Sequence, residues 1–282
     1  MHPENPHRSG YNFALLTARS AELKPFVIKS KRGEDTIDFD NPSAVRALNA
    51  ALLKTHHGVI FWEIPESFLC PPVPGRCDHL LHVARLFQDP RRLRVLDLGV
   101  GANCIYPLLG VSLFNWNFVA TDISPNALQA AQLIVTKNNL QAFIELRLQP
   151  NPKNKLSGVV GEKESFDLVI CNPPFHASAD EALAGTQRKR SNLGLKEKAK
   201  LNFGGVSSEL WCEGGEYGFI EKLIDESVRF RNQVKWFSSL VSRDDHVNGL
   251  IKYLERKEPK SIKLLEMQQG QKKSRILAWS FS

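Results

Sequence analysis

The stretch "LRVLDLGVGANC", residues 93–104, joins an apolar run to a turn that contains two glycines. The apolar run predicts a buried β-strand, with Asp97, Gly99 and Gly101 at its carboxyl end. Glycine suits this place because the turn is tight and the backbone must approach a ligand closely. A nicotinamide-binding loop would read G-x-G-x-x-G, but Cys104 stands where its third glycine would be. The stretch therefore predicts an α/β fold with a ligand site that differs from the dinucleotide-binding one.

From residue 93 onward the chain alternates between strand and helix patterns, which predicts a mainly parallel sheet with helices on both faces. Strands are expected at 93–99, 116–124, 143–149, 165–172, 233–242, 261–268 and 275–282, and helices at 125–139, 216–230 and 245–257. The last two strands are joined by a linker too short for a crossover helix, so they should form an antiparallel hairpin. A seven-stranded α/β sheet with a C-terminal hairpin is typical of Rossmann-like class I methyltransferases, whereas ordinary dinucleotide-binding domains lack the hairpin.

The N-terminal part of the chain carries fewer regular patterns. A helix is expected at 40–56, because its apolar residues recur on one face. Residues 1–35 are polar and residues 63–77 are rich in proline, so both segments should be irregular. A second helix is expected at 78–87. These patterns divide the chain into a small N-terminal extension and a main domain, at 1–80 and 81–282.

The composition is that of a globular protein, with 42% hydrophobic and 24% charged residues. No uninterrupted apolar segment reaches the roughly 18–20 residues that cross a bilayer. Residues 1–13 are polar and lack the apolar core of a signal peptide, so a cytoplasmic protein is expected. The five cysteines are widely spaced and form no C-x-x-C pair. We therefore expect buried free thiols rather than disulfides or a metal site.

The formal charge of +7 favours a polyanionic partner, and the distribution of this charge is more informative than its size. Residues 186–200, "TQRKRSNLGLKEKAK", hold six basic residues against one acid, and Arg188, Lys189 and Arg190 are consecutive. Such a run also suits a solvated loop. Because it closely follows the motif described below, we interpret it as a substrate-facing arm within a basic insertion at 176–212.

The end of the second strand carries an acid that suits a ribose. Asp122 stands 21 residues beyond Gly101, where a carboxylate can accept both ribose hydroxyls. In isolation it would suit a turn or a helix cap equally well, and Ser124 is the expected N-cap of the following helix. Asn103 either adds a polar contact to the ligand or caps the backbone of its own turn. S-adenosylmethionine has a ribose and an amino-acid end but no phosphate, and the D-x-G-x-G turn resembles the methyltransferase version of this loop.

The fourth strand ends in an unusual turn within "FDLVICNPPFHAS", residues 166–178. Parallel strands present their carboxyl ends at one rim of the sheet, so Asn172 should lie beside the glycine loop. Pro173 and Pro174 fix φ and remove two N–H donors. The Asn172 side chain and the Pro173 carbonyl thus offer acceptors beside the ring of Phe175. This set suits an exocyclic amine on a planar base, although a rigid strand exit would also use two prolines.

The chemistry of such an amine explains the residue types. The lone pair of an adenine N6 is delocalised into the ring, which makes the nitrogen a poor nucleophile. Hydrogen bonds from N6 to two acceptors favour a more tetrahedral nitrogen, and positioning supplies much of the rate gain. No strong general base is required, since the proton can leave after the methyl group arrives. Stacking on Phe175 would contribute about 1–3 kcal/mol, and His176 suits a contact residue better than a base.

Asn172 to Phe175 resemble the [DN]-P-P-[FYW] motif of amino-methyltransferases that act on adenine N6, cytosine N4 or glutamine amides. Seven further stretches distributed over nearly the whole chain narrow the choice. Together they resemble the bacterial 23S ribosomal RNA adenine-N6 methyltransferase family (RlmF). They are "HPENPHRSGYNF", "IDFDNPSAVRALNAALL", "CPPVPGR", "GANCIYPLLG", "CNPPFH", "GGVSSELWCEGGE" and "WFSSLVS".

The resemblance implies S-adenosyl-L-methionine as the cofactor and one adenine of 23S ribosomal RNA, free or in a ribosome assembly intermediate, as the target. It implies a monomer that needs neither metal nor membrane, with the 1–80 extension and the basic insertion gripping the RNA. The implied catalytic residues are Asn172, Pro173, Pro174 and Phe175. Cofactor contacts are implied for Arg76, Asp97, Gly99, Gly101, Asn103, Asp122 and Asn172. Substrate contacts are implied for Phe175, His176, Arg188, Lys189 and Arg190.

Two other functions stay open at this point. A protein glutamine-N5 methyltransferase would use the same motif but would not need a basic arm. A catalytically silent RNA-binding module would be free to lose Asp97 or Asn172, and both are present. The group that contacts the cofactor adenine is also open between Gln149 and the backbone, and Glu213 and Glu216 lie near the expected site without an assigned role.

Overall fold

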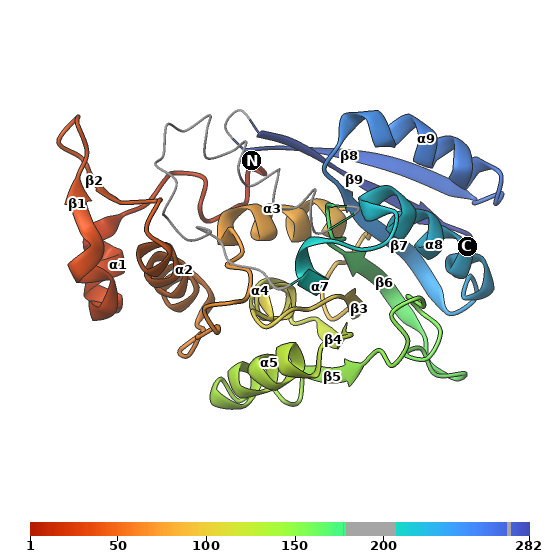
Figure 1. The fold of residues 1–282 in the computed structure, drawn as a ribbon, viewed down its shortest axis with the longest axis horizontal. Helices are drawn as coiled ribbons and strands as arrows, with labels where there is room; N and C mark the ends of the chain where they lie inside the picture. Colours follow the sequence, from red (N-terminus) through yellow and green to blue (C-terminus); the bar gives the residue numbers. More distant parts are fainter. Residues whose placement is uncertain (177, 179–206, 270–271) are drawn as a thin grey trace.

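The computed structural model describes residues 1–176, 178, 207–269 and 272–282. Within them a seven-stranded sheet runs in the order β5-β4-β3-β6-β7-β9-β8 (Figure 1). Neighbours from β5 to β7 are parallel, and β9 is antiparallel to both β7 and β8. The strands are β3 (Arg94–Leu98), β4 (Asn117–Asp122), β5 (Ile144–Leu148), β6 (Phe166–Cys171), β7 (Val234–Val241), β8 (Ser261–Gln269) and β9 (Lys272–Ser280). The predicted class I methyltransferase sheet and its C-terminal hairpin are confirmed.

Helices cover both faces of this sheet because successive residues of the buried strands point in opposite directions. On β3, Val95 belongs to one hydrophobic core and Leu96 to the other. The first core holds residues of α2 (Pro42–His57), α3 (Val73–Ala84), α4 (Ile105–Phe114) and α5 (Pro125–Lys137). The second holds residues of α8 (Gly215–Arg229) and α9 (Asp244–Glu255). None of the described helices is long and apolar enough to span a membrane.

Side-chain caps mark the starts of α2 and α5. The Asn41 side chain accepts hydrogen bonds from the backbone of Ser43 and Ala44, which begins α2. The Ser124 hydroxyl accepts one from the backbone of Ala127, which confirms it as the N-cap of α5. The five cysteines are free thiols, and all but Cys212 are buried, as expected.

The N-terminal part is more regular than predicted (Figure 1). The expectation of an irregular segment at 1–35 is wrong, because that segment holds most of four short elements. They are α1 (Phe13–Arg19), the 3₁₀ helix η1 (Ala21–Phe26) and an antiparallel pair, β1 (Val27–Lys29) with β2 (Asp35–Ile37). Their apolar residues, such as Leu16 and Leu23, are buried in the first core. Tertiary packing therefore stabilises elements too short to show a periodic pattern.

The helix expected at 78–87 begins five residues earlier, at Val73. The prediction of an irregular segment is wrong over residues 73–77, because proline is tolerated where a first-turn N–H has no partner. Pro72 is the N-cap and Pro74 lies in the first turn. The expected domain boundary at residue 80 thus falls inside α3. Pro107 occupies the first turn of α4 in the same way, and α4 has no counterpart among the expected elements.

Gly110 on α4 lies against two aromatic rings, and this contact yields a stability prediction. A Cβ atom there would lie 2.5 Å from Phe118 Cζ and 3.0 Å from Trp116 Cε3. Both rings are buried, so Gly110→Ala should destabilise the fold by about 1–3 kcal/mol through overpacking. Gly218→Ala on α8 is the matched control, since its Cβ would approach nothing closer than 3.5 Å. Thermal unfolding should show a lower Tm for the first variant and an equal or higher Tm for the second.

Candidate active site

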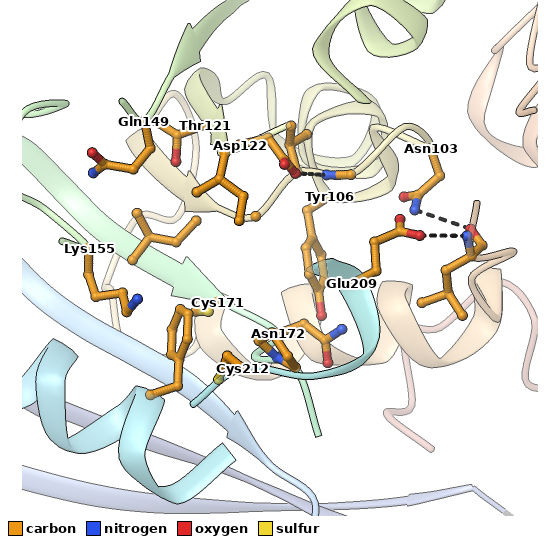
Figure 2. Close-up of a pocket in the computed structure, with 18 of the residues that line it drawn as sticks. Asn103, Tyr106, Thr121, Asp122, Gln149, Lys155, Cys171, Asn172, Glu209 and Cys212 are labelled. Carbon is orange, nitrogen blue, oxygen red and sulfur yellow. Dashed lines mark hydrogen bonds between the residues drawn. The ribbon is translucent and has the colours of Figure 1, made fainter. Parts of the chain in front are cut away.

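A pocket of about 1120 Å³, including its open mouth, lies at the carboxyl ends of β3, β4 and β6. It gathers most of the residues predicted to bind the cofactor, and Figure 2 shows several of them around one space. The predicted residues that line it are Arg76, Gly99, Gly101, Asn103, Asp122, Asn172 and Pro174. The carboxyl ends of the parallel strands therefore bring these residues to one pocket, as the rule for open α/β sheets predicts.

The glycine loop and Asp122 hold each other in place. Gly99 and Gly101 have φ values of 79° and 64°, in the left-handed region that favours glycine. Asp122 Oδ2 accepts a hydrogen bond of 2.9 Å from Gly101 N, and its Oδ1 accepts one of 2.9 Å from Ser124 N. A carboxylate has about four acceptor positions, so Asp122 can both fix the loop and accept ribose hydroxyls. Burial raises the pKa of its carboxyl.

Asp97 is buried beneath the glycine loop with 1% of its surface exposed. Neither of its carboxylate oxygens has a hydrogen-bond partner among the described residues. Burial raises the pKa of Asp97 well above its ordinary value, and the nearby Asp122 raises it further, while the Arg76 cation lowers it. A buried carboxylate without a partner is costly unless a cation satisfies it. The amino group at the methionine end of S-adenosylmethionine is such a cation, so these residues fit that cofactor.

Arg76 reaches the pocket from α3 and is held by an aromatic partner. Its Nη1 donates a hydrogen bond of 3.2 Å to the Tyr106 hydroxyl, and its guanidinium carbon lies 5.5 Å from the centroid of the same ring. The Tyr106 oxygen in turn lies 2.7 Å from His79 Nδ1. Burial lowers the pKa of His79 to about 3, so this ring is neutral. The network holds the cation at the pocket, where it suits the methionine carboxylate.

Two polar residues of the pocket are engaged by their own loops. Asn103 Oδ1 accepts a hydrogen bond of 3.1 Å from Ile105 N at the start of α4, which supports its interpretation as a local cap. Gln149 Oε1 accepts one of 3.1 Å from Asn151 N, and its Nε2 donates one of 3.1 Å to Ser157 O. Gln149 is therefore occupied with the loop after β5, which leaves the contact to the cofactor adenine open.

The NPPF turn extends from β6 into this pocket. Asn172 and Pro174 line the pocket, whereas Pro173 is buried. Asn172 Oδ1 is buried and has no hydrogen-bond partner among the described residues. Phe175 is half-buried against the first core and is not among the lining residues. The structure thus brings the predicted amide acceptor to the cofactor pocket, while the expected stacking ring lies to one side of it.

A segment that the sequence analysis quoted only for the family resemblance, without a site role for Glu209 or Trp211, closes the pocket beside Gly101 of the glycine loop. Glu209, at α7 (Ser207–Leu210), and Trp211 line it, and Glu209 Oε2 accepts a hydrogen bond of 2.9 Å from Leu69 N. His176 joins this segment to the NPPF turn, because its N donates to Leu210 O and its O accepts from Cys212 N, both at 3.1 Å. Long-range contacts with Leu69 and His176 bring the segment to the site, and such contacts leave no local sequence signal.

The remaining expected residues divide into three groups. Glu216 is buried and accepts hydrogen bonds from Ser242 N and His246 at 2.8 and 2.9 Å, so its visible role is structural. Glu213 is exposed and does not line the pocket. Arg188, Lys189 and Arg190 lie outside the residues that the structure describes.

Comparisons with known proteins agree with this geometry. A family model described as "RNA methyltransferase" matches residues 1–282. Ribosomal RNA large subunit methyltransferase F of Pseudomonas putida is 48% identical over 293 residues, which cover 100% of this chain and 92% of the relative. The protein of the same name from Pectobacterium atrosepticum is 46% identical over 288 residues, covering 100% and 93%.

Solved structures show the same fold. The hMettl16 catalytic domain in complex with MAT2A 3′UTR hairpin 1 has a TM-score of 0.88 and 32% identity, covering 100% of this chain and 96% of that one. The N-terminal domain of human METTL16 in complex with SAH has a TM-score of 0.81 and 28% identity, covering 100% and 99%. Family model, relatives and pocket agree, and the chain belongs to this family of S-adenosylmethionine-dependent RNA methyltransferases.

Proposed function

We propose that this enzyme methylates the N6 amine of one adenine in 23S ribosomal RNA. The observation that carries the proposal is the buried Asn172 Oδ1, an acceptor without a protein partner at the rim of the cofactor pocket. A buried amide oxygen of this kind is costly until a donor reaches it. An exocyclic amine is such a donor, and relatives named ribosomal RNA large subunit methyltransferase F favour a ribosomal RNA base over a protein side chain.

The chain's own residues then divide the work of the reaction. Asn172 Oδ1 and the Pro173 carbonyl accept the two N6 hydrogens, which concentrates the lone pair on nitrogen. Asp97, Arg76 and Asp122 hold the amino, carboxylate and ribose groups of S-adenosylmethionine, which supplies a methyl group on a positively charged sulfur. The proton that N6 loses would pass to water after the methyl group has arrived, so these residues need to supply no strong base. Catalysis therefore rests on positioning and electrostatics.

The RNA contacts belong to the parts that flank this centre. The 1–80 extension and the 176–212 insertion bind the RNA backbone, with Phe175 and His176 beside the extruded base. Ribosomal RNA or an assembling large subunit is the partner, and the enzyme acts on it as a monomer in the cytoplasm. The division at residue 80 is therefore not a strict functional one, because α3 crosses it and Arg76, which lines the cofactor pocket, lies on its N-terminal side.

Methyl transfer to defined substrates tests the proposal. The purified protein is incubated with labelled S-adenosylmethionine and either ribosomal RNA or ribosomal protein, and the products are digested to nucleosides or amino acids. Label in N6-methyladenosine is expected. Label in methylglutamine would show that the NPPF turn serves a protein amide instead. Tight RNA binding without any label would identify a silent binding module.

Replacing Arg188, Lys189 and Arg190 together with alanine should weaken RNA binding and reduce its salt dependence. Each lost phosphate contact lowers the slope of log K against log salt by about 0.7–0.9, so the slope should fall by roughly 2. Arg229, Arg231 and Lys235 provide a triple control, since they lie between the end of α8 and the start of β7 and do not line the pocket. Filter binding at several salt concentrations measures both slopes. Equal slopes for the first variant and the wild type would exclude the arm from RNA binding.

A further inference from the structure

Three segments far apart in the sequence meet at a buried cluster away from the cofactor pocket. His7 comes from the N-terminal segment, His57 is the last residue of α2, and Cys77 lies in α3. All three side chains are buried, and their ligand-forming atoms lie within 4.8 Å of one another. The two Nε2 atoms of the histidines are 3.0 Å apart.

The ring nitrogens of this cluster are incompletely satisfied by the protein. His57 Nδ1 lies 3.4 Å from the Ser112 hydroxyl, which can fix the orientation of this ring. His7 Nδ1 has no hydrogen-bond partner among the described residues, although only 3% of His7 is exposed. Burial lowers the pKa of His7 to about 3 and of His57 to about 4, so both rings are neutral, and in the hydrogen bond between their Nε2 atoms one ring donates and the other accepts. Two neutral imidazoles that face each other beside a thiol are a common ligand arrangement for a metal ion.

We propose that His7, His57 and Cys77 bind a zinc-type divalent cation through two imidazole nitrogens and one thiolate. A mixed nitrogen and sulfur donor set suits zinc, whereas magnesium and calcium prefer oxygen ligands. Zinc bonds of about 2.0–2.3 Å place tetrahedral ligand atoms roughly 3.3–3.8 Å apart, so the two Nε2 atoms, now 3.0 Å apart, must separate slightly, while the longest separation, at most 4.8 Å, must shorten by up to about 1 Å. Side-chain rotation supplies this movement, and a water molecule completes the coordination.

The location of the cluster assigns this ion a structural role. Cys77 directly follows Arg76 on α3, but Arg76 lines the cofactor pocket while Cys77 is buried in the first core. The N-terminal segment is already bonded to α3, because Asp78 Oδ1 accepts hydrogen bonds from His2 N and Asn5 Nδ2 at 2.6 and 3.2 Å. An ion at the cluster would join this segment, α2 and α3 at one point. It would therefore stabilise the helix that carries Arg76 without entering the reaction.

Cobalt titration of the wild-type protein tests the site directly. The protein, carrying a tag without histidine, is stripped with a chelator and titrated with Co²⁺ while the thiolate-to-cobalt absorption band is recorded. We expect one equivalent to produce the band and Zn²⁺ to remove it. A folded wild-type protein that develops no such band overturns the proposal, whatever the variants do.

One variant and two controls test Cys77 as the thiolate ligand. Cys77→Ser should abolish the charge-transfer band and the rise in Tm that Zn²⁺ gives the wild type. His56→Ala is the histidine control, because His56 neighbours His57 on α2 and packs edge-on against the His7 ring at 5.1 Å, but is exposed and is not one of the three proposed ligands. Cys212→Ser removes the one thiol that is not buried. Both controls should retain the band, and its persistence in Cys77→Ser or its loss in Cys212→Ser would place the cation elsewhere.

Discussion

Asn172→Ala should lower kcat by roughly 10²–10³-fold, the loss typical of removing one group that stabilises a transition state. The cofactor Kd should remain nearly unchanged. The reason is the position of Asn172 Oδ1, which is buried at the pocket rim and has no partner among the described residues. In the proposed reaction this oxygen accepts a hydrogen of the attacking amine. Single-turnover methylation gives the rate, and calorimetry with a non-reactive cofactor analogue gives the affinity.

Two further substitutions sharpen this prediction. Asn172→Asp keeps an acceptor oxygen and should retain part of the activity that alanine loses. Asn154→Ala removes another asparagine that lines the same pocket, from the loop after β5, and should leave kcat within a few-fold of the wild type. A collapse of cofactor binding in Asn172→Ala would assign Asn172 to the cofactor rather than to the amine.

Asp97→Asn should weaken cofactor binding by roughly 10²-fold or more, because removing one partner of a buried charge pair costs about 3–5 kcal/mol. The same variant should stabilise the cofactor-free protein. The two carboxylate oxygens of Asp97 in the wild type are buried without partners among the described residues. A neutral amide of the same shape therefore removes an unfavourable buried charge. Isothermal titration and thermal unfolding measure the two effects, which have opposite signs.

Asp167→Asn is the appropriate control for Asp97→Asn. Asp167 lies near the amino end of β6, where Oδ2 accepts a hydrogen bond of 2.8 Å from Arg94 N and Oδ1 pairs with Lys235. Its replacement should lower Tm modestly and leave cofactor affinity unchanged. If Asp97→Asn behaved in the same way, Asp97 would be a structural residue rather than a cofactor ligand.

The raised pKa of Asp97 also predicts a pH dependence. Its ordinary value is 3.8, and burial raises the pKa of this carboxyl well above it in the folded protein. Between these two values the folded state holds a proton that the unfolded state releases. The stability of the cofactor-free protein therefore falls as pH rises through this range. Asp97→Asn should show a smaller fall in Tm over the same range, and the difference isolates Asp97 from Asp122, whose pKa is also raised.

The sheet could be predicted because its strands are continuous apolar runs bounded by turn residues, and because the short 269–274 linker permits only a hairpin. The short N-terminal helices and strands could not be predicted from the sequence. Leu16 and Leu23 are buried by contacts with distant residues, and elements of three to seven residues show no periodicity. The first turn of α3 was obscured by its prolines, which local rules alone cannot distinguish from a proline-rich loop.

Some residues of the site could be predicted from the sequence and others could not. Asp97, Gly101, Asp122 and Asn172 could be located together, since each ends or follows a parallel strand. Arg76 came only from the family resemblance, because a loop arginine carries no signal of its own. Glu209 and Trp211 reach the pocket through pairing with His176, and a pairing across more than 30 residues cannot be read from either segment.

That pairing has a consequence for how the enzyme acquires new targets. His176 bonds to Leu210 and Cys212, so the two ends of the insertion meet beside the NPPF turn. The entropy of closing a loop grows slowly, by about 0.6 kcal/mol for each doubling of its length. Evolution can therefore lengthen, shorten or exchange this insertion while the methyl-transfer machinery stays intact. An insertion whose two ends are held together can thus vary in length and sequence, and with it the RNA that the enzyme binds, while the catalytic centre is unchanged.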